Sequence, residues 1–126
     1  MTVTYSPAQV TERSGFSLDT LRYYERIGLL DRVERATSGH RRYTEEDLGW
    51  LEILRCLRGT GMPIAKMLVF AEQVRAGERT IPDRVALLTA HDQEVEAEMA
   101  RLAQQRGKIQ EKIAHYRSLI ELGQLG

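Results

Sequence analysis

This 126-residue chain has a single cysteine, no excess of either charge sign and no long apolar stretch. Its one cysteine cannot form an internal disulfide, which excludes a secreted disulfide scaffold. No apolar run approaches the ~20 residues that cross a bilayer, and the first residues lack the basic start and apolar core of a signal peptide. These absences predict a soluble, cytoplasmic protein that does not interact with membranes, built as one domain with at most an appendage.

The net charge is zero, because 18 basic side chains balance 18 acidic ones. This balance hides a local excess, since residues 22–43 contain six arginines and only three carboxylates. Nucleic acid attracts local clusters of positive charge. Any contact with DNA must therefore be local.

Two short helices are predicted near the N-terminus. Ser6 is a suitable cap for a helix from Pro7 to about Arg13, and Ser17 is a suitable cap for a second helix that ends at Gly28. Such closely spaced helices are typical of a helix-turn-helix, whose second helix can enter the major groove of DNA. The pattern alone is a weak signal.

A hairpin, or wing, is predicted next. Residues 30–43 lose the helical periodicity and contain a cluster of turn formers at 36–39. Arg41 and Tyr43 should share one face of the second strand, because side chains alternate along a strand. These two residues are therefore predicted to contact a phosphate together, while Arg42 points to the other side.

Two further helices complete the N-terminal unit. Thr44 begins a capping-box pattern for a third helix, which should end at Gly59 or Gly61. Pro63 starts a fourth helix, which runs to Gly77.

The last third of the chain carries a coiled-coil seam. Steps of four and three from Leu88 reach an apolar residue at nearly every position, with Asp92 and Arg106 as the polar exceptions. One helix from about Asp83 to Leu122 would be roughly 60 Å long, too long to bury this seam against a small N-terminal unit. The predicted dimerisation residues are Leu88, Val95, Met99, Leu102, Ile109, Ile113, Tyr116 and Ile120.

Two arrangements can bury this seam. Either the helix pairs with that of a second copy, or it folds back on itself as a helical hairpin. Gly107 is the only candidate break and no turn cluster accompanies it, so we favour pairing in a homodimer. We accordingly predict a DNA-binding domain at residues 1–77 and a dimerisation helix at 78–126.

The second predicted helix has one polar face. Helical spacing turns Leu21 and Tyr24 inward and Arg22, Tyr23 and Arg26 outward. A guanidinium group can grip a phosphate or a guanine edge, while hydroxyl groups fix the helix on the DNA backbone. We predict that Arg22 reads bases. The alternative is an ordinary solvated helix face.

Lys66 lies in the first turn of the fourth predicted helix, where backbone amides favour an anion such as a phosphate. The alternative is a solvated surface lysine.

The run from 17 to 30, SLDTLRYYERIGLL, resembles the signature of MerR-type transcriptional regulators, as does GHRRY at 39–43. The resemblance continues through 57–62 and into the terminal coil, so it covers nearly the whole chain. It implies a mainly α fold, in which a winged helix-turn-helix domain of four helices is followed by a long helix. The long helices of two copies pair as an antiparallel dimerisation coiled coil.

The resemblance also implies a function without enzymatic activity or cofactor. Such a homodimer binds a pseudo-palindromic promoter operator and bends and untwists the double-stranded DNA, which realigns the promoter for RNA polymerase. The cost of this distortion is several kcal/mol. Transferred to this sequence, the DNA contacts are Ser17, Thr20, Arg22, Tyr23, Tyr24, Arg41 and Tyr43, to which charge and location alone add Arg42 and Lys66.

The signal that controls such a regulator is a separate question. Metal-sensing members carry cysteines at and after the dimerisation helix, where this chain has none, so we expect no metal site. A subgroup that the chain resembles responds to aldehydes and other electrophiles, as a stress response, through a single cysteine. Here Cys56 lies between Arg55 and Arg58 in the sequence, and such cations favour a reactive thiolate. The alternative, which we favour, is that Cys56 is a small buried hydrophobic residue.

Two other classes of protein compete with this interpretation. A coiled-coil interaction module could use its helix-turn-helix to bind a protein partner, and its affinity would then depend little on salt, unlike binding to DNA. An enzyme would need a phosphate-binding glycine loop, a metal-ligand set or an activated nucleophile, and the sequence has none of these.

Overall fold

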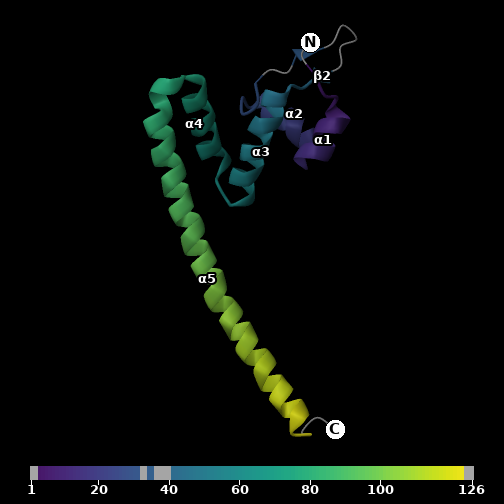
Figure 1. The fold of residues 1–126 in the computed structure, drawn as a ribbon, viewed down its shortest axis with the longest axis vertical. Helices are drawn as coiled ribbons and strands as arrows, with labels where there is room; N and C mark the ends of the chain where they lie inside the picture. Colours follow the sequence, from purple (N-terminus) through teal and green to yellow (C-terminus); the bar gives the residue numbers. More distant parts are fainter. Residues whose placement is uncertain (1–2, 32–33, 36–40, 124–126) are drawn as a thin grey trace. The chain divides into compact units, whose positions relative to one another are not determined.

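The computed structural model describes residues 3–31, 34–35 and 41–123, and the chain forms two compact units, residues 1–87 and 88–126. Helices dominate both units (Figure 1). In chain order the elements are α1 (Pro7–Ser14), α2 (Leu18–Arg26), β1 (Glu34–Arg35), β2 (Arg41–Arg42), α3 (Glu45–Gly59), α4 (Ile64–Arg75), the 3-10 turn η1 (Glu78–Thr80) and α5 (Ile81–Glu121). The prediction of a mainly α fold is confirmed.

The first two helices begin at the predicted caps. The Ser6 hydroxyl accepts a hydrogen bond from the Gln9 backbone N–H, and the Gln9 side chain accepts one from the Ser6 N–H. The Ser17 hydroxyl accepts from the backbone N–H of Thr20 at 3.1 Å. Each cap satisfies amide groups that have no partner inside the helix, which fixes where the helix starts.

The turn of the helix-turn-helix is closed by an arginine from α3. The Arg55 guanidinium donates from Nη1 to the backbone oxygen of Ser14, 2.7 Å away, at the C-terminal end of α1. This contact satisfies a terminal carbonyl and places positive charge at the negative end of the helix dipole. Gly15 follows with φ of 78°, and a Cβ atom there would lie 1.7 Å from Arg55 Nη1. The position therefore requires glycine for two reasons.

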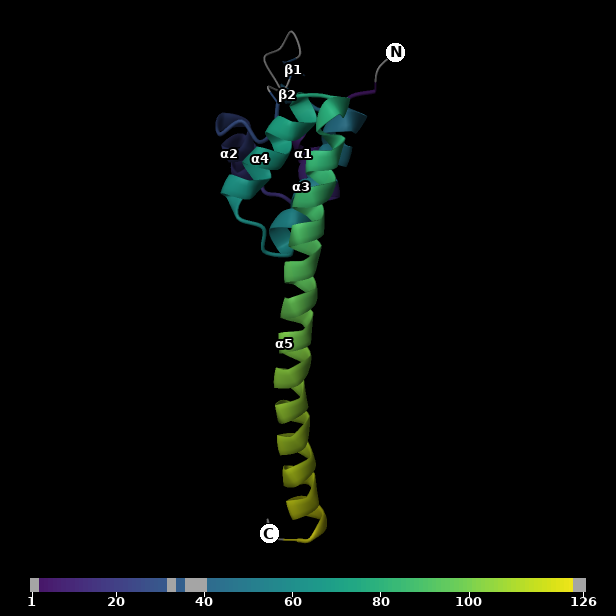
Figure 2. The same ribbon diagram turned by 90° about the vertical axis from the view of Figure 1, so that its left-hand side faces the viewer.

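The core of the N-terminal unit lies among the first four helices. Helix α1 packs against α2 and α3, and α3 packs against α4 (Figure 2). Burying each large apolar side chain contributes about 1.5–3 kcal/mol relative to exposing it. The largest fully buried side chains among the described residues are Val10, Leu21, Leu29, Leu30, Tyr43, Leu51, Leu54, Met62 and Met67.

The predicted wing is an antiparallel hairpin of β1 and β2, at one end of the helical unit (Figure 2). Glu34 pairs with Arg42, and Arg35 pairs with Arg41. The predicted turn at 36–39 lies outside the described residues. Tyr5 forms a bridge beside the hairpin, because the backbones of Tyr5 and Tyr43 exchange two hydrogen bonds of 2.7 and 2.9 Å. The N-terminal segment thus anchors the base of the wing.

Helix α5 runs for 41 residues, or about 60 Å at ~1.5 Å per residue. It passes through Gly107 without a break, so the alternative of a helical hairpin is wrong. The two compact units divide within this helix, and the predicted boundary between residues 77 and 78 falls at the start of η1. Among the described residues, no helix combines the length and hydropathy needed to cross a membrane.

Replacing Gly15 should destabilise the protein more than any other Gly→Ala change in the first unit. We expect Gly15→Ala to lower the free energy of unfolding by about 1–3 kcal/mol, because it strains the backbone and displaces the Arg55 guanidinium. The matched control is Gly49→Ala in α3, where a Cβ meets nothing within 4 Å and should raise stability by roughly 0.5–1 kcal/mol. Urea unfolding measures both values, and equal stabilities for the two variants would contradict the assignment.

Candidate nucleic-acid interface

Helix α2 has the two faces that its spacing predicts. Leu21 and Tyr24 are buried, whereas Arg22, Tyr23 and Arg26 are exposed. The Arg26 guanidinium lies over the Tyr23 ring, 5.5 Å from the ring centroid, a cation–π contact worth roughly 0.5–1 kcal/mol at an exposed site. This contact restricts both side chains. The outer face of α2 therefore presents positive charge beside a phenol.

The start of α2 adds hydroxyl groups to the same helix. The Ser17 hydroxyl donates to Thr20 Oγ1 at 2.9 Å and accepts from the Thr20 backbone N–H. Since the Ser17 proton is used inside the cap, the proton of the Thr20 hydroxyl is the one left to donate outward. A helix N-terminus also carries partial positive charge, which suits a phosphate oxygen.

Tyr24 lies in the core rather than on the DNA-facing side. It is only 3% exposed, and its ring packs edge-on against Phe16 with centroids 5.3 Å apart. Burial raises the pKa of the Tyr24 hydroxyl above its ordinary value, while the nearby Arg58 acts in the opposite direction. The prediction that Tyr24 contacts DNA directly is therefore wrong for this structure, because helical spacing turns the ring inward.

The wing also differs from its prediction. Tyr43 is 1% exposed and Arg42 is exposed. Because neighbouring strand residues face opposite sides, Arg42 lies on the outer face and Tyr43 packs inward, where the Tyr5 segment covers it. The predicted joint contact of Arg41 and Tyr43 with a phosphate is therefore wrong for Tyr43. Arg41 occupies β2, but its side chain and residue 40 lie outside the described part of the chain.

Lys66 is exposed in the first turn of α4, as predicted. The N-cap position is Pro63, and no side chain caps this end of the helix. The backbone N–H of Lys66 is already bonded to the Pro63 oxygen at 3.0 Å. The earlier amides of α4 are thus the ones available to an anion, beside the lysine.

Cys56 is exposed, so the packing interpretation that we favoured is wrong. It lies on the outer side of α3, between the buried residues Leu54 and Leu57. The neighbouring guanidinium groups are bound to backbone oxygens instead of lying free beside the thiol. Arg55 donates to Ser14 at 2.7 Å, and Arg58 donates to Met62 at 3.4 Å.

The described part of the chain leaves the coiled-coil seam uncovered. Leu88 and Val95 are partly exposed, and the other predicted dimerisation residues are all exposed. The exposed fractions range from 44% for Ile113 to 66% for Met99. A row of large apolar side chains along one helix is the surface expected of a partner-binding helix.

Sequence reasoning missed a set of structural residues around the wing. Arg75 of α4 donates from Nε to Asp31 at 2.8 Å and from Nη2 to the Gly28 backbone oxygen at 2.5 Å, between α2 and β1. Trp50 of α3 donates to the Leu29 oxygen at 2.8 Å. The only sign of these contacts in the sequence was a single tryptophan, Trp50, within a predicted helix. Nothing in the sequence pointed to Arg75, because its partners lie more than 40 positions away.

A helix-turn-helix followed by a β hairpin defines the class of winged helix-turn-helix DNA-binding proteins. The profile of the MerR HTH family regulatory proteins matches residues 5–67. An uncharacterised HTH-type transcriptional regulator of Haemophilus influenzae is 37% identical over 96% of this chain and 90% of its own length. The Bacillus subtilis HTH-type transcriptional regulator AdhR is 41% identical over 64% of this chain and 58% of its own.

Solved structures agree with these sequence matches. HiNmlR, described as a MerR family regulator lacking the sensor domain and bound to promoter DNA, superposes with a TM-score of 0.84 at 37% identity, covering 96% of both chains. A MerR family regulator from Listeria monocytogenes gives a TM-score of 0.86 at 32% identity, over 95% of this chain and 91% of its own. The chain belongs to the MerR family of transcriptional regulators, which are not enzymes.

Proposed function

We propose that this regulator binds a pseudo-palindromic promoter operator as a homodimer and controls transcription by deforming the DNA. The observation that carries the proposal is the outer face of α2, where Arg22, Tyr23 and Arg26 are exposed over a fully buried inner face. Two copies of this helix would enter adjacent stretches of major groove on one side of the duplex. Such a regulator acts on chromosomal DNA in the cytoplasm.

The contacts divide into two kinds. Arg22 reads base edges, because a guanidinium can bond to guanine through two hydrogen bonds. Ser17, Thr20 and Tyr23 fix α2 on the DNA backbone. The wing residues Arg41 and Arg42 and the α4 residue Lys66 bind phosphates, with Arg42 supported by its exposure. Tyr24 and Tyr43 support these elements from the core.

Dimerisation follows from the exposed seam of α5. Leaving its apolar side chains in water is unfavourable by about 25 cal/mol for each Å² that a partner would cover. A second α5, running antiparallel, covers the seam with a matching copy of itself. The paired helices then hold two recognition helices at a set distance, as a palindromic operator requires.

Deformation of the operator gives the dimer a means of control. Bending a site of 20–30 base pairs costs of the order of 1–6 kcal/mol, which phosphate contacts from the wings can offset. DNA that is bent and untwisted in this way presents its promoter elements differently to RNA polymerase. The DNA-bound state of the neighbour HiNmlR supports the first step, the binding of promoter DNA.

Replacing Arg22 and replacing Arg42 should affect DNA binding in different ways. We expect Arg22→Ala to remove the preference for the operator over unrelated DNA, a loss of about 1–3 kcal/mol in discrimination. Arg42→Ala should weaken binding to all sequences and reduce the salt slope by about one. Titrations of labelled operator and scrambled DNA at several salt concentrations measure both effects. Arg79→Gln, an exposed cation of η1 away from α2, is the control.

Either of two results would contradict this assignment. One is unchanged discrimination in the Arg22→Ala variant. The other is wild-type binding that does not depend on salt, which would favour a helix-turn-helix that binds a protein partner.

The dimer should depend on the seam and not on the rest of α5. We expect Ile109→Glu to shift the protein from dimer to monomer in sedimentation velocity, because the change buries a charge at the centre of the paired helices. Gln104→Glu adds the same side chain at an exposed position off the seam and should leave the dimer intact. A wild-type protein that sediments as a monomer at micromolar concentration refutes the proposed dimer.

We further propose that Cys56 is the sensing residue, on the strength of its exposure. Its thiol can add across an aldehyde C=O, which forms a C–S bond and moves the thiol proton to the oxygen. Cys56→Ser should keep operator binding and lose any aldehyde-induced change in promoter output. Measuring transcription in vitro with and without formaldehyde tests this, and a serine variant that still responds fully rejects the role.

A further inference from the structure

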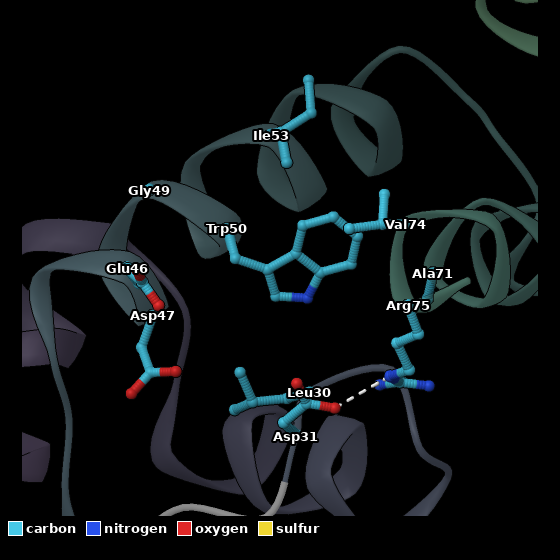
Figure 3. A pocket seen from close by; sticks show the side chains of 10 residues that line it. All are labelled: Leu30, Asp31, Glu46, Asp47, Gly49, Trp50, Ile53, Ala71, Val74 and Arg75. Carbon is cyan, nitrogen blue, oxygen red and sulfur yellow. Dashed lines mark hydrogen bonds and ion pairs between the residues drawn. The ribbon is translucent and has the colours of Figure 1, made fainter. Parts of the chain in front are cut away.

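A cavity of about 450 Å³ lies within the N-terminal unit, on none of the residues that we assign to DNA (Figure 3). The segment between α2 and β1, the first turns of α3 and the end of α4 form its walls. Small-molecule sites commonly enclose about 300–1,000 Å³. The cavity is therefore large enough for a compact organic ligand.

The aromatic ring of Trp50 lines this cavity and is held in place by two contacts. The Trp50 indole lies among the lining side chains, with Val74 beside its six-membered ring and Leu30 below its nitrogen in the view of Figure 3. Phe70, which does not line the cavity, stacks on one face of the indole at 5.6 Å and 15°. The indole N–H is bonded to the Leu29 oxygen, so the ring cannot easily turn. A ring held in this way gives the cavity one wall of fixed orientation.

Carboxylates outnumber cations in the lining. Asp31, Glu46 and Asp47 face a single guanidinium, that of Arg75. Arg75 is bonded to Asp31 at 2.8 Å, and Asp47 accepts from the Thr44 backbone N–H at 2.9 Å. Within the described part of the chain, Glu46 has no hydrogen-bond or ion-pair partner. Of the three lining carboxylates, Glu46 is thus the one with neither a hydrogen bond nor a counter-charge among the described residues.

We propose that this cavity binds a small organic cation with a flat apolar body, such as an aromatic ammonium compound. The cationic group is attracted by Glu46 and by the negative face of the Trp50 ring, while the apolar body packs against Leu30, Ile53 and Val74. An anion of the same shape is repelled by the excess of carboxylates. The proposal goes beyond promoter binding and does not depend on it.

Tryptophan fluorescence of the full-length protein without DNA tests the site directly, because Trp50 is the only tryptophan in the chain. The probe is benzyltrimethylammonium, compared with phenylacetate and benzyl alcohol, which carry the same ring with negative and no charge. We expect saturable binding of the cation, at least about tenfold tighter than that of either comparison compound. Equal affinities for the three compounds, or no saturable change with the cation, would overturn the proposal.

Charge variants separate this site from non-specific attraction. Glu46→Gln should weaken binding of the cation about fivefold or more without changing the circular dichroism spectrum. Glu72→Gln removes a carboxylate from the exposed side of α4, outside the cavity, and should bind like the wild type. Trp50→Leu, followed by calorimetry, should lose the preference for the cation. Unchanged binding by Glu46→Gln refutes the site even if the other variants do not fold.

Discussion

The contact between Arg55 and the last turn of α1 is the constraint on which the DNA-facing geometry depends. The guanidinium joins the carbonyl oxygen of Ser14 to α3 across the tight turn at Gly15, and no side chain larger than hydrogen fits there. The turn sets the angle at which α2 leaves α1. Helix α3 in turn carries Leu51, Leu54 and Leu57 into the same core as Leu21 of α2. One hydrogen bond therefore links the turn, the core and the helix that we propose enters the groove.

Local signals predicted much of this structure because they depend on residues close together in the sequence. The caps at Ser6, Ser17 and Thr44 and the unbroken course of α5 through Gly107 follow from spacings of three or four residues. The outward face of α2 follows from the same helical period. A helix cap or a helical face needs no knowledge of distant partners, so these features could be predicted without the structure.

The errors in the candidate site have the opposite origin, since each depends on contacts between distant segments. Tyr43 is buried because the Tyr5 segment, 38 positions earlier in the chain, pairs with it, which no strand alternation reveals. Alternation correctly separated Arg42 from Tyr43, but it could not say which of them faces the core. Cys56 is exposed because Leu54 and Leu57 fill the inner face of α3, although its residue type favours burial.

Charge is segregated within a chain whose total charge is zero. The outer face of α2 and the exposed Arg42 of β2 are cationic, whereas the cavity beside Trp50 has more carboxylates than cations. Arg75 lines this cavity, and its bonds to Gly28 and Asp31 fix the segment that joins α2 to the wing. A uniformly basic domain would bind phosphates at many angles. Here the cationic face is local. The segment between α2 and β1 carries the Arg75–Asp31 ion pair, and the cavity is acidic, so the domain favours one orientation on a duplex.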